Sequence, residues 1–379
     1  MTLDTLDRTN VDTAEGMDRA TASPVKPAVI DCDVHPTVKS LAELKPYLER
    51  RWWERLQRYG LRPRHGFVMS EPYPKAQPRA ARRDSWAPDG AVPGSDLAFM
   101  RRHYLDACGI ETAILNPLYP TAQGDQNVDF TTAMCAACNE WQKESWVRQE
   151  PRLRASVVVS YEDTPAAVAE IERRAGDPAF AQVLILARTA EPLGRKRYWP
   201  IYEAAARAGL PVAAHVFGFG GYPVSGGGWP SYYLEEMTGH SAACQGQVAS
   251  LVLEGVFERI PDLKVIIVEG GFGWLPPLMW RLDKHWSRLR AEVPHVTRLP
   301  SEIIREHIWI TTQPMEEPER PEHLVACMEA VGWDRLLFAT DYPHWDFDDP
   351  SRALPASLSA ERRRQVWSGN ARKLYRLGA

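Results

Sequence analysis

The chain has 379 residues, of which 44% are hydrophobic and 25% charged, and its formal net charge is −4. This composition is ordinary for a globular protein whose core is large enough to be stable without disulfide bonds. The small negative charge gives no electrostatic reason to expect nucleic acid as a partner, and no apolar run approaches the roughly 18 residues that span a bilayer.

The first 27 residues, MTLDTLDRTNVDTAEGMDRATASPVKP, contain several acids and no apolar signal core. Such a segment is typical of a disordered leader rather than a signal peptide, which favours a cytoplasmic location. Residues 28–379 are then expected to form one catalytic domain.

Eight short runs rich in Val, Ile and Leu follow Pro27 and alternate with amphipathic segments. Apolar runs without polar alternation are typical of strands buried on both faces. The runs are residues 28–35, 112–117, 155–162, 181–188, 210–217, 263–270, 307–313 and 335–341. Helical patterns at 164–176, 198–209 and 246–263 separate some of them, and Gly176 and Gly209 stand where C-terminal caps belong. This repeat predicts a (β/α)8 TIM barrel, with an open doubly wound sheet as the alternative.

Two long insertions interrupt the repeat, at residues 37–100 after the first strand and 218–240 after the fifth. Insertions at the carboxyl ends of barrel strands usually cover the active site, so we expect both to be lid-like. The second contains Trp229, whose ring would suit a flat or cyclic substrate.

Ligand-type residues end three of the predicted strands. The first ends in Asp33-Val34-His35, the fifth in His215 and the eighth in Asp341. Residues i and i+2 of a strand point to one side, so Asp33 and His35 should project together, with Asp31 below them. Because strand ends converge at one mouth of a barrel, two imidazoles and two carboxylates should meet there. That set predicts one divalent metal ion, zinc in the first place and manganese as the alternative.

The chain resembles the amidohydrolase superfamily in these strand ends. The runs VFERIPDLKVIIVEGGFGWLPPLMWRLDKHW (256–286) and FATDYPHWD (338–346) are similar to its amidohydrolase 2 branch. That branch contains aminocarboxymuconate-semialdehyde decarboxylase and γ-resorcylate decarboxylase, together with hydrolases and hydratases. The resemblance implies the metal ligands Asp33, His35, His215 and Asp341. It also implies a single metal, since strand four ends in Arg188 without the lysine that bridges two.

Glu269 departs from the pattern, because the resembling decarboxylases carry a histidine after strand six. An ionised Glu269 in the pocket would repel a substrate carboxylate unless it were paired. It could instead orient water, cap the following helix or pair with Arg281.

The expected function is a metal-dependent hydrolase acting on a C–N or C–O bond of a small cyclic or aromatic substrate, with Asp341 as general base and acid. The same residues could run a non-oxidative decarboxylation, in which Asp341 protonates a carbon. A metal-binding relative without turnover is the second alternative. Further candidates are Glu269 and His344 for catalysis, and Arg188 and His240 for substrate binding. The resemblance also implies a homo-oligomer.

Overall fold

The computed structural model describes residues 28–61, 74–123, 125, 127–218 and 223–378. The predicted leader, residues 1–27, lies outside the described residues, as do four residues of the second insertion, 219–222.

Eight parallel strands form one sheet in which every strand pairs with its neighbours in chain order. The strands are β1 (Val29–Val34), β2 (Ile110–Leu115), β3 (Leu153–Val158), β4 (Phe180–Arg188), β5 (Val212–Gly218), β6 (Val265–Val268), β7 (Ile308–Thr311) and β8 (Leu336–Leu337). The last strand returns to the first: the Cys32 amide donates to Phe338 O at 2.9 Å and the His35 amide to Tyr342 O at 2.8 Å. The sheet therefore closes into the predicted barrel.

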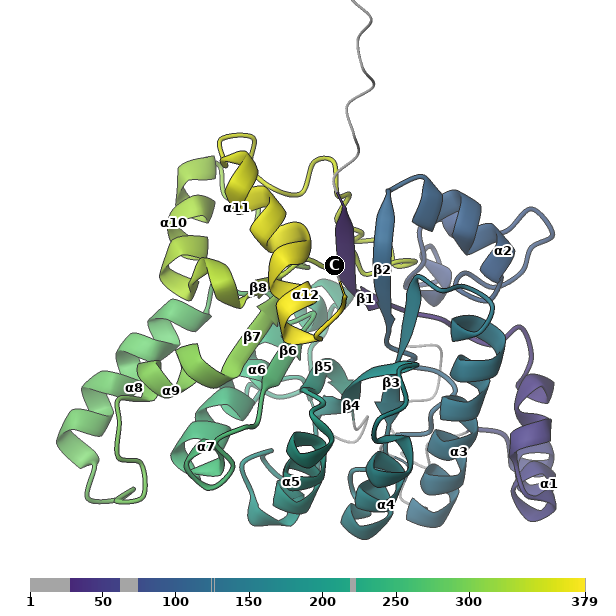
Figure 1. Ribbon diagram of the computed structural model, residues 1–379, viewed down its shortest axis with the longest axis horizontal. Helices are drawn as coiled ribbons and strands as arrows, with labels where there is room; N and C mark the ends of the chain where they lie inside the picture. The colour runs from purple at the N-terminus through teal and green to yellow at the C-terminus, as the bar shows by residue number, and fades with distance from the viewer. Residues whose placement is uncertain (1–27, 62–73, 124, 126, 219–222, 379) are drawn as a thin grey trace, which may run out of the picture.

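Helices surround the strands (Figure 1). They are α1 (Arg50–Tyr59), α2 (Leu97–Met100), α3 (Val128–Trp141), α4 (Thr164–Arg174), α5 (Trp199–Ala208), α6 (Tyr233–Leu253), α7 (Val256–Arg259), α8 (Leu275–Leu289), α9 (Pro300–His307), α10 (Pro321–Val331), α11 (Ala360–Arg364) and α12 (Asn370–Leu374). Shorter 3₁₀ or π segments are η1 (Leu41–Tyr47), η2 (Pro78–Ala80), η3 (Arg83–Ser85), η4 (Arg101–Asp106), η5 (Gln142–Val147), η6 (Lys196–Tyr198), η7 (Trp333–Arg335) and η8 (Gln365–Gly369).

Local chemistry explains where several helices begin and end. The Asp163 carboxylate accepts from the Ala166 amide before α4, and Pro165 follows in the first turn, an arrangement that satisfies amides left free at a helix start. Gly209 ends α5 in the left-handed conformation, at φ 69°, which costs glycine little. The largest difference from prediction is α6, which begins at Tyr233 rather than near residue 246, so His240 lies on a helix.

Both insertions leave the barrel at the carboxyl ends of their strands. In the first, the Thr37 amide donates to Gly94 O at 2.9 Å, which joins the two ends of the insertion, and the Arg82 amide donates to Pro343 O at 2.9 Å, which ties the insertion to the loop after β8. In the second, burial raises the pKa of Tyr233, whose hydroxyl also interacts with Trp345. Parts of both insertions therefore reach the loop after β8; opening and closing as lids stays a prediction.

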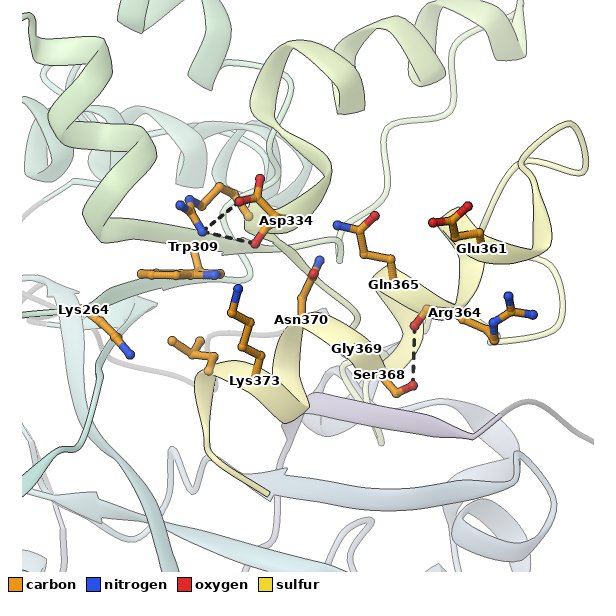
Figure 2. A pocket seen from close by; sticks show the side chains of 12 residues that line it. Lys264, Trp309, Asp334, Glu361, Arg364, Gln365, Ser368, Gly369, Asn370 and Lys373 are labelled. Carbon is orange, nitrogen blue, oxygen red and sulfur yellow. Dashed lines mark hydrogen bonds and ion pairs between the residues drawn. The ribbon is translucent and has the colours of Figure 1, made fainter. Parts of the chain in front are cut away.

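The opposite end of the barrel carries a separate cavity of about 580 Å³ (Figure 2). Lys264, just before β6, and Asp334, just before β8, line it together with Trp309 and Lys373. Since conserved chemistry in TIM barrels lies at the carboxyl ends of strands, this cavity is not the expected catalytic pocket. Among the described helices, none is long and apolar enough to cross a membrane.

Candidate metal centre

Four side chains at the carboxyl ends of three strands form a buried group of possible metal ligands. Asp33, His35, His215 and Glu269 each offer one donor atom, and these atoms all lie within 4.8 Å of one another. His35 and Glu269 form an overlapping group of the same size with Asp341 and His344, which are not strand residues. Three of the four predicted ligands, Asp33, His35 and His215, therefore share one group with Glu269, and the fourth, Asp341, lies in the overlapping group.

The contacts inside these groups are short. His35 Nε2 lies 3.2 Å from Asp33 Oδ1 and 2.8 Å from Asp341 Oδ1. His215 Nε2 lies 3.6 Å from Asp33 Oδ2 and 2.8 Å from Glu269 Oε2. His35 Nε2 and His215 Nε2 both face carboxylate oxygens. The potential ligand nitrogens and the carboxylates therefore point at a common centre.

Asn116, the residue after β2, orients the first-strand ligands. Its backbone carbonyl accepts from His35 Nδ1 at 2.7 Å, and its Nδ2 donates to Asp33 Oδ1 at 2.8 Å. A proton on Nδ1 leaves the Nε2 lone pair of His35 for a metal, which is the usual role of such an outer partner. Asn116 Oδ1 in turn accepts from Ser156 and Gln182 in the barrel interior.

Two of the acids have left-handed backbones: φ is 57° at Glu269 and 63° at Asp341. This conformation costs a non-glycine residue about 1–2 kcal/mol, and such residues concentrate at functional sites. The Glu269 amide is held by Thr311 Oγ1 at 3.0 Å, and the Asp341 amide by Asp33 O at 3.2 Å. These bonds hold the turns that direct both carboxylates into the centre.

Asp341 has further partners besides His35. His344 Nδ1 lies 2.6 Å from the same oxygen, Asp341 Oδ1, and Gln313 Nε2 donates to Asp341 Oδ2 at 3.3 Å and to Asp346 Oδ2 at 3.0 Å. The His344 ring stacks on the His35 ring with centroids 4.6 Å apart. His344 is 14% exposed, whereas Asp341 is fully buried. His344 is therefore a partly exposed side chain in contact with the buried Asp341.

The centre contains more carboxylates than the two histidines could neutralise. Burial would raise the pKa of Asp33, but His35 and His215 hold it well below its usual range. Burial would lower the pKa of His215, yet Asp33 and Glu269 raise it to about 9. Burial raises the pKa of Glu269 to about 7, with Asp341 adding to the rise, and burial also holds the pKa of Asp341 well above its usual range.

These residues fit a divalent cation. Asp33 Oδ2, His35 Nε2, His215 Nε2 and Glu269 Oε2 are buried and make no well-formed hydrogen bond within the described residues. Buried polar atoms without partners are costly, and a cation would satisfy all four at once. Imidazole nitrogens with carboxylate oxygens are ligands of both zinc and manganese.

The predicted substrate-binding residues differ in burial. Arg188 ends β4 with its side chain 11% exposed, and His240 on α6 is buried. Trp229 is 54% exposed, so its ring faces outward in this structure.

Two neighbouring acids have other partners. Asp31, expected below the centre, accepts from the Tyr104 hydroxyl and from the Thr340 hydroxyl and amide. Glu269 does not cap the next helix, since α8 starts at Leu275 without a side-chain cap.

Sequence reasoning did not find Asn116 or Gln313. Both are polar residues at the carboxyl ends of apolar strands, the signal that revealed His215, but neither is a common metal ligand. An inspection of every strand end for amides as well as for acids and histidines would have found them.

The closed barrel and the ligands at its mouth define an amidohydrolase-type protein, and sequence comparison agrees. The profile of the amidohydrolase family (Amidohydro_2) matches residues 30–377, so the chain belongs to that family.

Particular relatives are decarboxylases. The chain is 27% identical over 317 residues to the γ-resorcylate decarboxylase of Rhizobium radiobacter, covering 76% of this chain and 93% of that protein. It is 28% identical over 147 residues to the 2-amino-3-carboxymuconate-6-semialdehyde decarboxylase of Dictyostelium discoideum, 38% of each chain. Its fold is similar to that of the 5-carboxyvanillate decarboxylase of Novosphingobium aromaticivorans, solved with manganese and 4-hydroxy-3-methoxy-5-nitrobenzoic acid. There the TM-score is 0.68 at 20% identity, over 93% of this chain and 96% of that one.

Proposed function

We propose that this protein is a metal-dependent, non-oxidative decarboxylase of an aromatic carboxylic acid. The observation that carries the proposal is the meeting of Asp33, His35, His215 and Glu269 at one buried point, with Asp341 and His344 beside it. The names of the relatives favour decarboxylation over the hydrolysis that the sequence first suggested.

Asp33, His35 and His215 would hold the ion, with Glu269 as a fourth donor. When bound, a divalent ion would neutralise the carboxylate that is to be lost and an adjacent oxygen. Manganese is the ion present in the similar 5-carboxyvanillate decarboxylase, and zinc remains the alternative.

Asp341 supplies the proton in this proposal. Its buried carboxyl lies beside the predicted metal ligand His35, with Oδ1 2.8 Å from His35 Nε2, which places it to deliver a proton to a substrate held at the centre. The proton goes to the ring carbon that bears the carboxylate. The carbon–carbon bond then breaks, its electron pair restores the aromatic ring, and carbon dioxide leaves. His344, hydrogen-bonded to Asp341 and partly exposed, would return a proton from solvent.

Glu269 no longer argues against a carboxylate substrate. Its Oε2 lies 2.8 Å from His215 Nε2, among the atoms that would hold the ion, so the bound cation would pair its charge rather than leave it directed unopposed at the substrate. From the sequence, Glu269 is expected to repel a substrate carboxylate only if its charge is unpaired.

The test is incubation of the manganese- or zinc-loaded protein in D₂O with hydroxybenzoates, cyclic amides and lactones. Carbon dioxide release with one deuterium on the vacated ring carbon is the expected result. A product heavier than its substrate by one water would overturn the proposal in favour of hydrolysis. Bound metal without turnover of any compound would instead favour the inactive relative.

A further inference from the structure

Arg188 is a buried cation with little to balance it. It ends β4 with its side chain 11% exposed, and its Nε has no hydrogen-bond partner among the described residues. Its one ion pair in the described chain, with Glu236 on α6, has a long Nη2–Oε1 distance of 4.0 Å. Burial lowers the pKa of Arg188, and Glu236 and Tyr161 only partly oppose this. A buried charge without a close partner is expensive to maintain, which points to an anion that arrives from outside.

Two further donors near Arg188 also lack partners. His240 is 4% exposed, and neither of its ring nitrogens makes a hydrogen bond within the described residues. The hydroxyl of Tyr161, a residue shortly after β3 that is 1% exposed, is likewise unpaired there. Arg188 acts electrostatically on both side chains. Three unpaired polar groups therefore lie on one side of the barrel mouth, and buried polar groups normally have partners.

One aromatic side chain, Phe217, lies between His240 and the predicted metal ligand His215. The Phe217 ring stacks on the His215 ring at 5.6 Å and meets the His240 ring edge-on at 5.2 Å. Strand pairing sets Leu186 beside His215 and Arg188 beside Gly218. A planar molecule lying along Phe217 would have one end at the metal ligands and the other toward Arg188.

We propose that Arg188, His240 and Tyr161 form an anion subsite, so that the substrate is an aromatic acid with a second carboxylate. One carboxylate is lost at the metal centre, and the other is retained against the Arg188 guanidinium, with His240 and Tyr161 able to donate to it. This inference rests on the proposed decarboxylation. The alternative is that Arg188 only forms a structural ion pair with Glu236 and binds no substrate.

Binding of inert probes tests the subsite without any turnover. We expect the metal-loaded protein to bind isophthalate at least 10-fold more tightly than benzoate in calorimetry, because the Arg188 guanidinium would add charge-assisted hydrogen bonds to the second carboxylate. Arg188→Met should lower isophthalate affinity to the benzoate level and leave benzoate affinity nearly unchanged. Arg188→Lys, which keeps the charge, should retain part of the preference.

Glu236→Gln is the matched control. A subsite predicts that this variant keeps or strengthens isophthalate binding, because Arg188 is freed. A purely structural ion pair predicts that Glu236→Gln and Arg188→Met lose stability alike and that neither changes the isophthalate preference. Equal affinity of the unmodified protein for isophthalate and benzoate would also refute the subsite.

Turnover gives the second readout. Hydroxybenzenedicarboxylates should be decarboxylated with kcat/KM about 100-fold above salicylate, and Arg188→Met should remove that advantage mainly through KM. If salicylate is turned over as fast as every dicarboxylate, the subsite is refuted but the decarboxylase is not. Carbon dioxide released from neither class would refute the decarboxylase, while the binding result would still decide the subsite.

Discussion

Gly94 and Gly90 provide a controlled test of how the first insertion supports the metal centre. Both have left-handed backbones, with φ of 78° and 79°. A Cβ at Gly90 would meet nothing within 4 Å, whereas a Cβ at Gly94 would lie 2.4 Å from the backbone oxygen of His35. Alanine at either position therefore incurs the same local strain, and only Gly94→Ala also presses on a predicted metal ligand.

The magnitudes follow from these contacts. Left-handed alanine costs about 1–2 kcal/mol, which is the whole expected effect of Gly90→Ala. At Gly94 the His35 oxygen must retreat by about 1 Å to reach an ordinary contact, and forced overpacking of this kind adds about 1–3 kcal/mol. Since the displaced residue is His35, metal affinity should also fall by about 10–100-fold, the usual effect of disturbing a ligand's support.

Denaturant titration in EDTA measures the stability difference, and metal titration of the folded variants measures affinity. Melting temperature is the less sensitive assay. With an unfolding entropy of about 2.1 cal/mol/K per residue, a stability loss of 1 kcal/mol lowers the melting temperature of a chain of this size by only about 1–2 °C. Equal destabilisation of the two variants, or unchanged metal affinity in Gly94→Ala, would refute the claim that this glycine lets the insertion approach His35.

Asp341→Asn should lower decarboxylation by at least 100-fold while far-UV circular dichroism stays unchanged, because asparagine tolerates the left-handed backbone; retained turnover would remove Asp341 from proton transfer. Adding metal to EDTA-treated protein at 100 times its Kd should raise the free energy of unfolding by about 2.7 kcal/mol, and Asp33→Asn should lose most of that gain. Glu150→Gln should cost about 2–3 kcal/mol at pH 7. Hydrogen bonds from Arg152, then Arg101, lower the pKa of Glu150 from 4.5 to about 2, which corresponds to about 3.4 kcal/mol, and solvent screening of the partly exposed arginines reduces that value. That stability is complete above pH 4.5 and is lost as the pH falls toward 2, so denaturation curves of variant and unmodified protein should converge on acidification.

The sequence alone determined the architecture and most of the centre. Burial periodicity is a local property, so eight apolar runs between amphipathic segments were enough to predict a barrel. A barrel brings all its strand ends to one mouth, and the ends of β1, β5 and β8 could therefore be placed near one another before any coordinates. The homo-oligomer implied by the resemblance stays a prediction.

Tertiary structure decided how these residues face one another. The 2.8 Å contact of Glu269 with His215, and the positions of Arg188, His240 and Tyr161 around Phe217, depend on side chains from different elements. No local pattern encodes such contacts. They arise from the register of closed strands, from left-handed turns at two acids, and from α6 beginning at Tyr233. Each depends on packing between segments far apart in the chain, which is why the ligand types were readable from sequence and their partners were not.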